Sequence, residues 1–90
     1  MKREHEQALA AVRAAMNEVL ANFPENREVY ILDAVDSYLS KTDLARLCVD
    51  EIEEQLDDED LELGTVAVLD DGTVIMCDLE EGRVWIAGEA

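Results

Sequence analysis

The chain has 90 residues, enough for one domain near the lower end of the usual size range. Twenty-three Asp and Glu face seven Lys and Arg, so the formal charge is −16 and direct binding to nucleic acid or an anionic membrane is unfavourable. Apolar residues make up 49% of the chain, which is typical of a folded protein rather than a disordered one. Basic partners, cations or a salty medium suit such a charge, and a homodimer would add buried surface.

The N-terminal part of the chain has the pattern of an amphipathic helix, expected over residues 4–22. Its apolar residues recur at steps of three and four: Leu9, Val12, Met16, Val19, Leu20 and Phe23. Numerous alanines raise its helix propensity and leave a second smooth surface for another helix. His5, the only histidine, lies between Glu4 and Glu6, and we expect it to be solvated. These early charges also argue against a secretion signal.

The dipeptide Phe23-Pro24 marks the end of this helix, because a residue before proline avoids helical backbone angles. Pro24 suits the opening of a second helix, expected over residues 25–39. The apolar face of that helix comprises Ile31, Leu32, Val35, Tyr38 and Leu39. Residues 29–32 (VYIL) are also compatible with a strand, so both interpretations stay open for this segment.

A third helix is expected over residues 43–57, capped by Ser40 or Thr42. An apolar residue recurs every four positions, at Leu44, Cys48, Ile52 and Leu56. At 100° per residue the acidic side chains fall on the opposite side, within about 160° of arc. They are Asp43, Asp50, Glu51, Glu53, Glu54, Asp57 and Asp58. The expected helix therefore separates into an apolar face and an acidic face.

From Gly64 onward the pattern is that of short strands, expected over residues 65–69, 73–77 and 83–87. Asp71-Gly72 is a hairpin signal, and Gly82 favours a second turn. The sequence therefore predicts an α+β fold, with three helices followed by a three-stranded antiparallel β-meander packed on them. Residues 1–90 are expected to form a single domain.

The densest charge lies from Asp50 to Glu62, where nine of thirteen residues are acidic and none is basic. A helix from Asp50 to Asp58 rises about 12 Å and carries six carboxylates, one per ~2 Å. Duplex DNA presents one charge per ~1.7 Å of axis. Charge runs are usually solvated helix faces, whereas surfaces suited only to solubility mix both signs. A solvated face and phosphate imitation both remain open. The candidate partner-binding residues are Asp50, Glu51, Glu53, Glu54, Asp57, Asp58, Asp60 and Glu62.

Recognisable catalytic, metal-binding or cofactor-binding motifs are missing from the sequence. One histidine and two distant cysteines, Cys48 and Cys77, do not make a structural metal site, and we expect both thiols to be reduced. Residues 58–62 resemble a calcium loop only in part, because Gly64 comes one position late and the closing glutamate is missing. We expect a cytoplasmic protein that is not an enzyme and has no cofactor and no metal.

In length, charge and its continuous acidic segment, residues 50–62, the chain resembles the small acidic inhibitors made by phages, such as anti-CRISPR and anti-restriction DNA mimics. The resemblance implies a stoichiometric inhibitor that fills a basic nucleic-acid-binding surface of a partner protein or complex. The candidate partner-binding residues of this chain would act there as phosphate substitutes.

Two alternatives stay open. Bacteriocin immunity proteins are similar in size and charge and imply a nuclease toxin as partner, but the expected meander departs from their all-helical pattern. Salt adaptation of a halophile's structural or regulatory domain would also explain the acidity. Acidic residues outside the segment favour that alternative, at Glu4, Glu18, Asp33, Asp36, Asp78 and Glu89.

Overall fold

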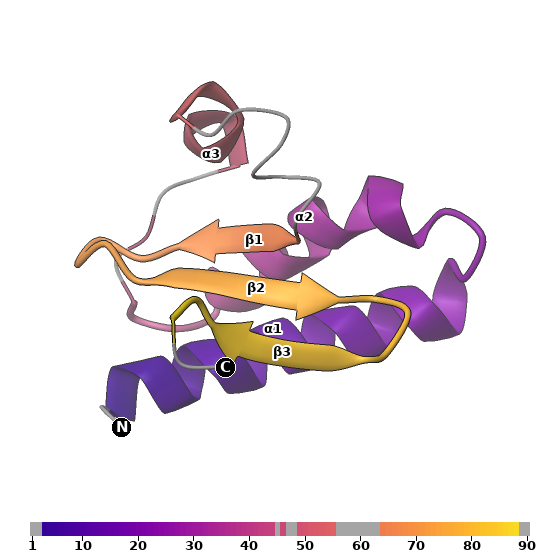
Figure 1. The fold of residues 1–90 in the computed structure, drawn as a ribbon, viewed down its shortest axis with the longest axis horizontal. Helices are drawn as coiled ribbons and strands as arrows, with labels where there is room; N and C mark the ends of the chain where they lie inside the picture. The colour runs from indigo at the N-terminus through magenta and orange to yellow at the C-terminus, as the bar shows by residue number, and fades with distance from the viewer. Residues whose placement is uncertain (1–2, 45, 47–48, 56–63, 89–90) are drawn as a thin grey trace.

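The structure is a computed structural model, and it describes residues 3–44, 46, 49–55 and 64–88. Its helices are α1 (Arg3–Asn22), α2 (Arg27–Leu39) and α3 (Val49–Gln55), and its strands are β1 (Thr65–Val68), β2 (Val74–Asp78) and β3 (Arg83–Ile86). The strands form one antiparallel sheet in the order β1-β2-β3. The α1–α2 hairpin covers one face of this sheet, and α3 lies beside β1 (Figure 1). The predicted α+β class, with helices before strands, is confirmed.

The core lies between the helical hairpin and the sheet. At its centre, Ile75 of β2 is completely buried against the helices, together with Val12 of α1 and Val35 of α2. Ala8 and Ala15 are also completely buried, so their short side chains let neighbouring elements approach α1 closely. The buried cluster comprises Ala8, Val12, Ala15, Met16, Val19, Ile31, Val35, Leu39, Val66, Ala67, Leu69, Ile75 and Cys77. The helical periodicity of the sequence predicted six of the eight helical members of this cluster, all except Ala8 and Ala15.

The first helix ends at Asn22 as predicted, but the exposure of Phe23 and the start of α2 differ from the expectation. Phe23 was predicted to extend the buried face of the first helix, but its side chain is 43% exposed. The backbone N–H of Asn26 donates to the carbonyl of Phe23 at 3.1 Å, which closes a turn through Pro24. Pro24 therefore lies within this turn, and α2 begins at Arg27. Residues 29–32 are helical, so the strand alternative was wrong.

The expected third helix begins six residues later than predicted, because hydroxyl groups complete the end of α2 instead of capping a new helix. Ser40 Oγ donates to the carbonyl of Asp36 at 2.7 Å, and Thr42 Oγ1 donates to that of Leu39 at 2.6 Å. Thr42 Oγ1 also accepts from the N–H of Leu44, which fixes the following bend. Arg46 then forms an antiparallel bridge with Leu69. Extended pairing of Arg46 is incompatible with a helix that runs through this residue.

The β1–β2 hairpin follows the turn signal in the sequence. The N–H of Leu69 donates to the carbonyl of Thr73 at 2.8 Å, and Gly72 adopts a positive φ of 91° inside the turn. At the other end of β1 the register shifts between Thr65 and Ala67, which marks a bulge. The three strand predictions are accurate to one residue at each end. Local turn chemistry therefore suffices to place the meander.

Gly64 provides a stability test at the start of β1. Its φ is +104°, and a Cβ there would come within 2.5 Å of the carbonyl oxygen of Cys77. The Gly64→Ala variant should lose about 3 kcal/mol or more of unfolding free energy, because backbone strain and a backbone clash add. Gly72→Ala is the matched control, since its φ is also positive but nothing lies within 4 Å. It should lose only about 1–2 kcal/mol. Equal losses in urea denaturation would contradict the close approach at Gly64.

Candidate functional site

The candidate site is the acidic face of α3, and a buried isoleucine holds it in place. Ile52 is only 3% exposed, whereas Asp50, Glu51, Glu53 and Glu54 are exposed. At 100° per residue these four carboxylates point 100–160° away from the Ile52 direction, according to ideal helix geometry of about 3.6 residues per turn. The helix therefore binds the body of the protein through one side and presents acid on the rest.

The energetics of α3 depend on this anchor. A seven-residue helix is too short to be stable alone in water. Like charges three or four positions apart, such as Asp50 with Glu54, destabilise a helix by about 0.2–0.5 kcal/mol per pair. Burying one isoleucine contributes about 1.5–3 kcal/mol. The burial of Ile52 therefore contributes more than the repulsion between carboxylates costs. Asp50 and Glu51 in the first turn also stabilise the helix, because they lie at the positive end of its dipole.

The charge density of α3 is close to that of a duplex. The helix rises about 6 Å from Asp50 to Glu54 and carries four carboxylates over that length, one per ~1.5 Å. Duplex DNA has one charge per ~1.7 Å. The structure brings these four predicted site residues together on one solvent-facing surface. The other four predicted residues, Asp57, Asp58, Asp60 and Glu62, lie outside the described residues.

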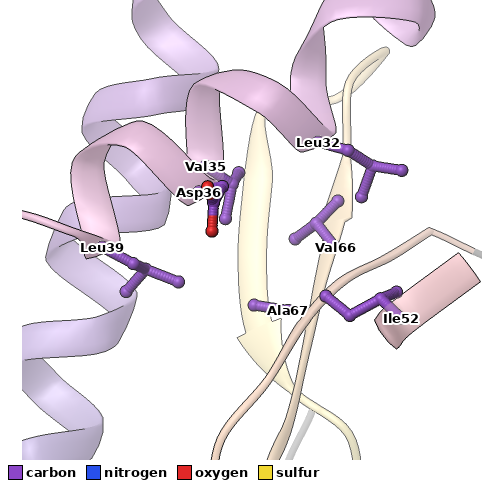
Figure 2. A pocket seen from close by; sticks show the side chains of 7 residues that line it. All are labelled: Leu32, Val35, Asp36, Leu39, Ile52, Val66 and Ala67. Carbon is purple, nitrogen blue, oxygen red and sulfur yellow. The ribbon is translucent and has the colours of Figure 1, made fainter. Parts of the chain in front are cut away.

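A shallow hollow lies under α3, between that helix, α2 and β1. Figure 2 shows Val66 and Ala67 of β1 between Ile52 on one side and the side chains of α2 on the other. The cavity volume is only about 10 Å³, far below the ~300–1,000 Å³ of typical small-molecule sites. Its lining is apolar apart from one carboxylate: Leu32, Val35, Asp36, Leu39, Ile52, Val66 and Ala67. The hollow is the place where Ile52 packs α3 against α2 and β1, and it is too small for a substrate.

Arg46, the only basic residue between Lys41 and Arg83, is directed toward α2. Its guanidinium donates to Asp36 Oδ1 at 3.1 Å and to Ser40 Oγ at 2.6 Å. Arg46 falls within the range expected for the third helix, residues 43–57, but it precedes α3 and pairs with α2. Its positive charge therefore compensates a carboxylate of α2.

A second polar cluster joins the first turn of α1 to the β1–β2 turn. His5 Nε2 lies 3.2 Å from Asp71 Oδ2 and 3.1 Å from Thr73 Oγ1, and the histidine side chain is only 14% exposed. The expectation of a solvated His5 was wrong, because Asp71 is 66 residues away and only the fold brings the two together. The Asp-Gly turn was visible in the sequence, but nothing local showed which element it would touch.

The arrangement of this cluster indicates a structural clamp. Both partners approach the same imidazole nitrogen, whereas a catalytic relay would use one nitrogen for the carboxylate and the other for the hydroxyl. The hydroxyl and the backbone N–H of Thr73, followed by His5, lower the pKa of Asp71 to about 2. Asp71 Oδ1 accepts the Thr73 N–H at 2.9 Å, so the carboxylate orders its own turn.

Cys77 is a free thiol in the core, beneath the sheet. Burial, with a smaller effect of Asp78, raises the pKa of Cys77 to about 11. The thiolate is the reactive form of cysteine, so this side chain is a poor nucleophile at neutral pH. Cys48 lies outside the described residues. Among the residues that the structure describes, no three His, Cys, Asp or Glu side chains converge to hold a metal ion.

The chain matches no protein-family model, no curated protein and no solved structure. The described helices include none that is long and apolar enough to cross a membrane.

The depressed pKa of Asp71 predicts an acid-sensitive clamp. A carboxyl has an ordinary pKa near 3.9 when unfolded, so the lowered folded value stabilises the protein above about pH 4. That contribution is lost as the pH falls through about 2, the folded pKa of Asp71. The Asp71→Asn variant should melt below the wild type at pH 7, and the gap should close between pH 4 and pH 2. Asp70→Asn makes the same charge change at the neighbouring exposed residue. An Asp70 variant with the same pH-dependent gap would contradict the role given to Asp71.

Proposed function

We propose that this protein is a non-catalytic inhibitor that occupies a basic nucleic-acid-binding surface of a partner protein, as DNA mimics of the anti-CRISPR or anti-restriction type do. The observation that carries the proposal is the set of exposed carboxylates on α3, spaced nearly as densely as duplex phosphates. The packing of Ile52 against α2 and β1 supports the proposal. A helix held in this way presents its charges without the entropy cost of ordering a flexible acidic segment.

Recognition would use charge-assisted hydrogen bonds. Asp50, Glu53 and Glu54 would accept from Lys or Arg side chains that otherwise hold phosphates. A groove built for a polyanion has several such cations, so the large negative charge of the chain also speeds encounter with it. The same charge opposes direct contact with nucleic acid. Targets of this kind act in the cytoplasm, which is where the proposal places the protein.

Neutralising the acidic face tests the proposal. A triple variant with Asp50→Asn, Glu53→Gln and Glu54→Gln removes three charges and keeps side-chain shape. The partner would be captured from host lysate at physiological salt, identified and purified, and labelled duplex DNA would then be displaced from it. Truncating one member of a desolvated ion pair costs about 2–5 kcal/mol, so the variant should need at least about 30-fold more protein for displacement.

The control changes the same charge elsewhere, with Glu4→Gln, Glu6→Gln and Glu80→Gln at exposed positions of α1 and the β2–β3 turn. It should displace DNA nearly as well as the wild type, and both variants should melt at similar temperatures. If the two triple variants weaken displacement equally, net charge alone is responsible and α3 is not a recognition element.

Salt adaptation is the rival function, and the exposure of acid on other elements favours it. Glu28 and Asp33 on α2, Asp43 after it and Glu80 before β3 are all exposed. If the acidity is a salt adaptation, the repulsion between carboxylates at a net charge of −16 must be screened by salt before the chain folds.

Circular dichroism during thermal melting separates the two functions. The inhibitor proposal predicts a cooperative transition near 0.15 M salt, where the Debye length is about 8 Å, because the buried layer between hairpin and sheet is continuous. Molar salt should raise the melting temperature only moderately. A chain that folds only in molar salt would favour the halophile alternative.

A further inference from the structure

The α1–α2 connection carries apolar surface that the fold does not use. All residues from Ala21 to Tyr30 are exposed except the half-buried Arg27. Three of them are large and apolar: Phe23 is 43% exposed, Val29 70% and Tyr30 41%. Among the residues that the structure describes, these are the exposed large hydrophobic side chains. The connection lies at one end of the molecule, away from α3 (Figure 1).

The two aromatic side chains contact each other, and the backbone that carries Val29 and Tyr30 is fixed by hydrogen bonds. The rings of Phe23 and Tyr30 lie with their centroids 4.5 Å apart and their planes tilted by 33°, within the range of favourable aromatic pairs. Backbone bonds from the N–H groups of Val29 and Tyr30 to the carbonyl of Asn26 fix the first turn of α2. The patch therefore loses little conformational entropy when it is covered, which favours binding.

Charge around the patch is acidic. Glu25 and Glu28 are exposed beside it in the chain, and Asp33 follows Val29 by four residues and so shares its helix face. The one cation of the segment, Arg27, donates through its guanidinium to the carbonyl of Pro24 at 2.8 Å and so closes the turn. An apolar anchor bordered by carboxylates complements an apolar or aromatic side chain flanked by Lys or Arg.

We propose that Phe23, Val29 and Tyr30 form a second docking surface, which takes a basic protein segment with a large apolar side chain at its centre. A second copy of this chain is a poor occupant, because it would bring the same carboxylates and a charge of −16 against themselves. Three side chains also fall well short of the roughly 800 Å² per partner that a stable dimer buries. The surface stands apart from α3 and does not depend on the function proposed for that helix.

Two synthetic peptides test this surface. Both are eleven residues of alternating lysine and glycine, with either tryptophan or serine at the centre, so their charge is the same. The tryptophan peptide should bind the wild type about tenfold more tightly, as expected for burying one large apolar side chain. Its amide chemical-shift changes in NMR should map to residues 23–30. The double variant Val29→Ser with Tyr30→Ser should bind the two peptides almost equally.

A charge variant separates this surface from the acidic helix. Glu53→Gln with Glu54→Gln should weaken both peptides by the same factor and leave the preference for tryptophan intact. The docking surface is ruled out if the wild type shows no preference, if the Val29 and Tyr30 variant keeps it, or if the shift changes map to α3. It is also ruled out if sedimentation shows a wild-type dimer that the Val29→Ser change dissociates.

Discussion

The apolar layer between the α1–α2 hairpin and the inner face of the sheet is the interaction on which the rest of the structure depends. Ile75 of β2, Val12 of α1 and Val35 of α2 are buried together within it. A chain of this size buries a smaller share of its surface than a larger domain does. With a charge of −16, the folded state also repels itself. The layer must offset both penalties, while the described carboxylates of α3 lie on the outside.

The other interactions attach peripheral elements to that layer. Arg46 ties the segment before α3 to Asp36 and Ser40, and Ile52 seats α3 against α2 and β1. His5 ties the start of α1 to Asp71 in the β1–β2 turn. In each case a small number of contacts holds an element whose outer surface is exposed. Residues on these exposed surfaces contribute little to the core, so a fold of this kind is compatible with binding a partner through them.

Local patterns in the sequence were enough to predict the elements but not the contacts between them. Apolar residues at helical spacing predicted α1 and α2, and Asp71-Gly72 predicted the hairpin, because those signals act over a few residues. The late start of α3 could not be predicted, since it follows from Arg46 pairing with residues of α2 and with Leu69.

Among the candidate sites, local sequence likewise predicted some features, and others depend on contacts that only the fold makes. The acidic run predicted the exposed carboxylates of α3 directly, because charge density can be read from spacing alone. Phe23 had the spacing of a core residue, and only the turn through Pro24 shows that it is left exposed beside Tyr30. The partner of His5 likewise depends on how the hairpin turn meets α1.

The most direct measurement of the central claim is a structure of the protein bound to its partner, by crystallography or cryo-electron microscopy. We expect Asp50, Glu53 and Glu54 to lie within hydrogen-bonding distance of Lys or Arg side chains that hold phosphates in the partner's nucleic-acid complex. The face of α3 should be dehydrated in that structure, with Ile52 still seated under it. A complex in which α3 points to solvent, or in which the partner's nucleic-acid-binding surface stays open, would contradict the account.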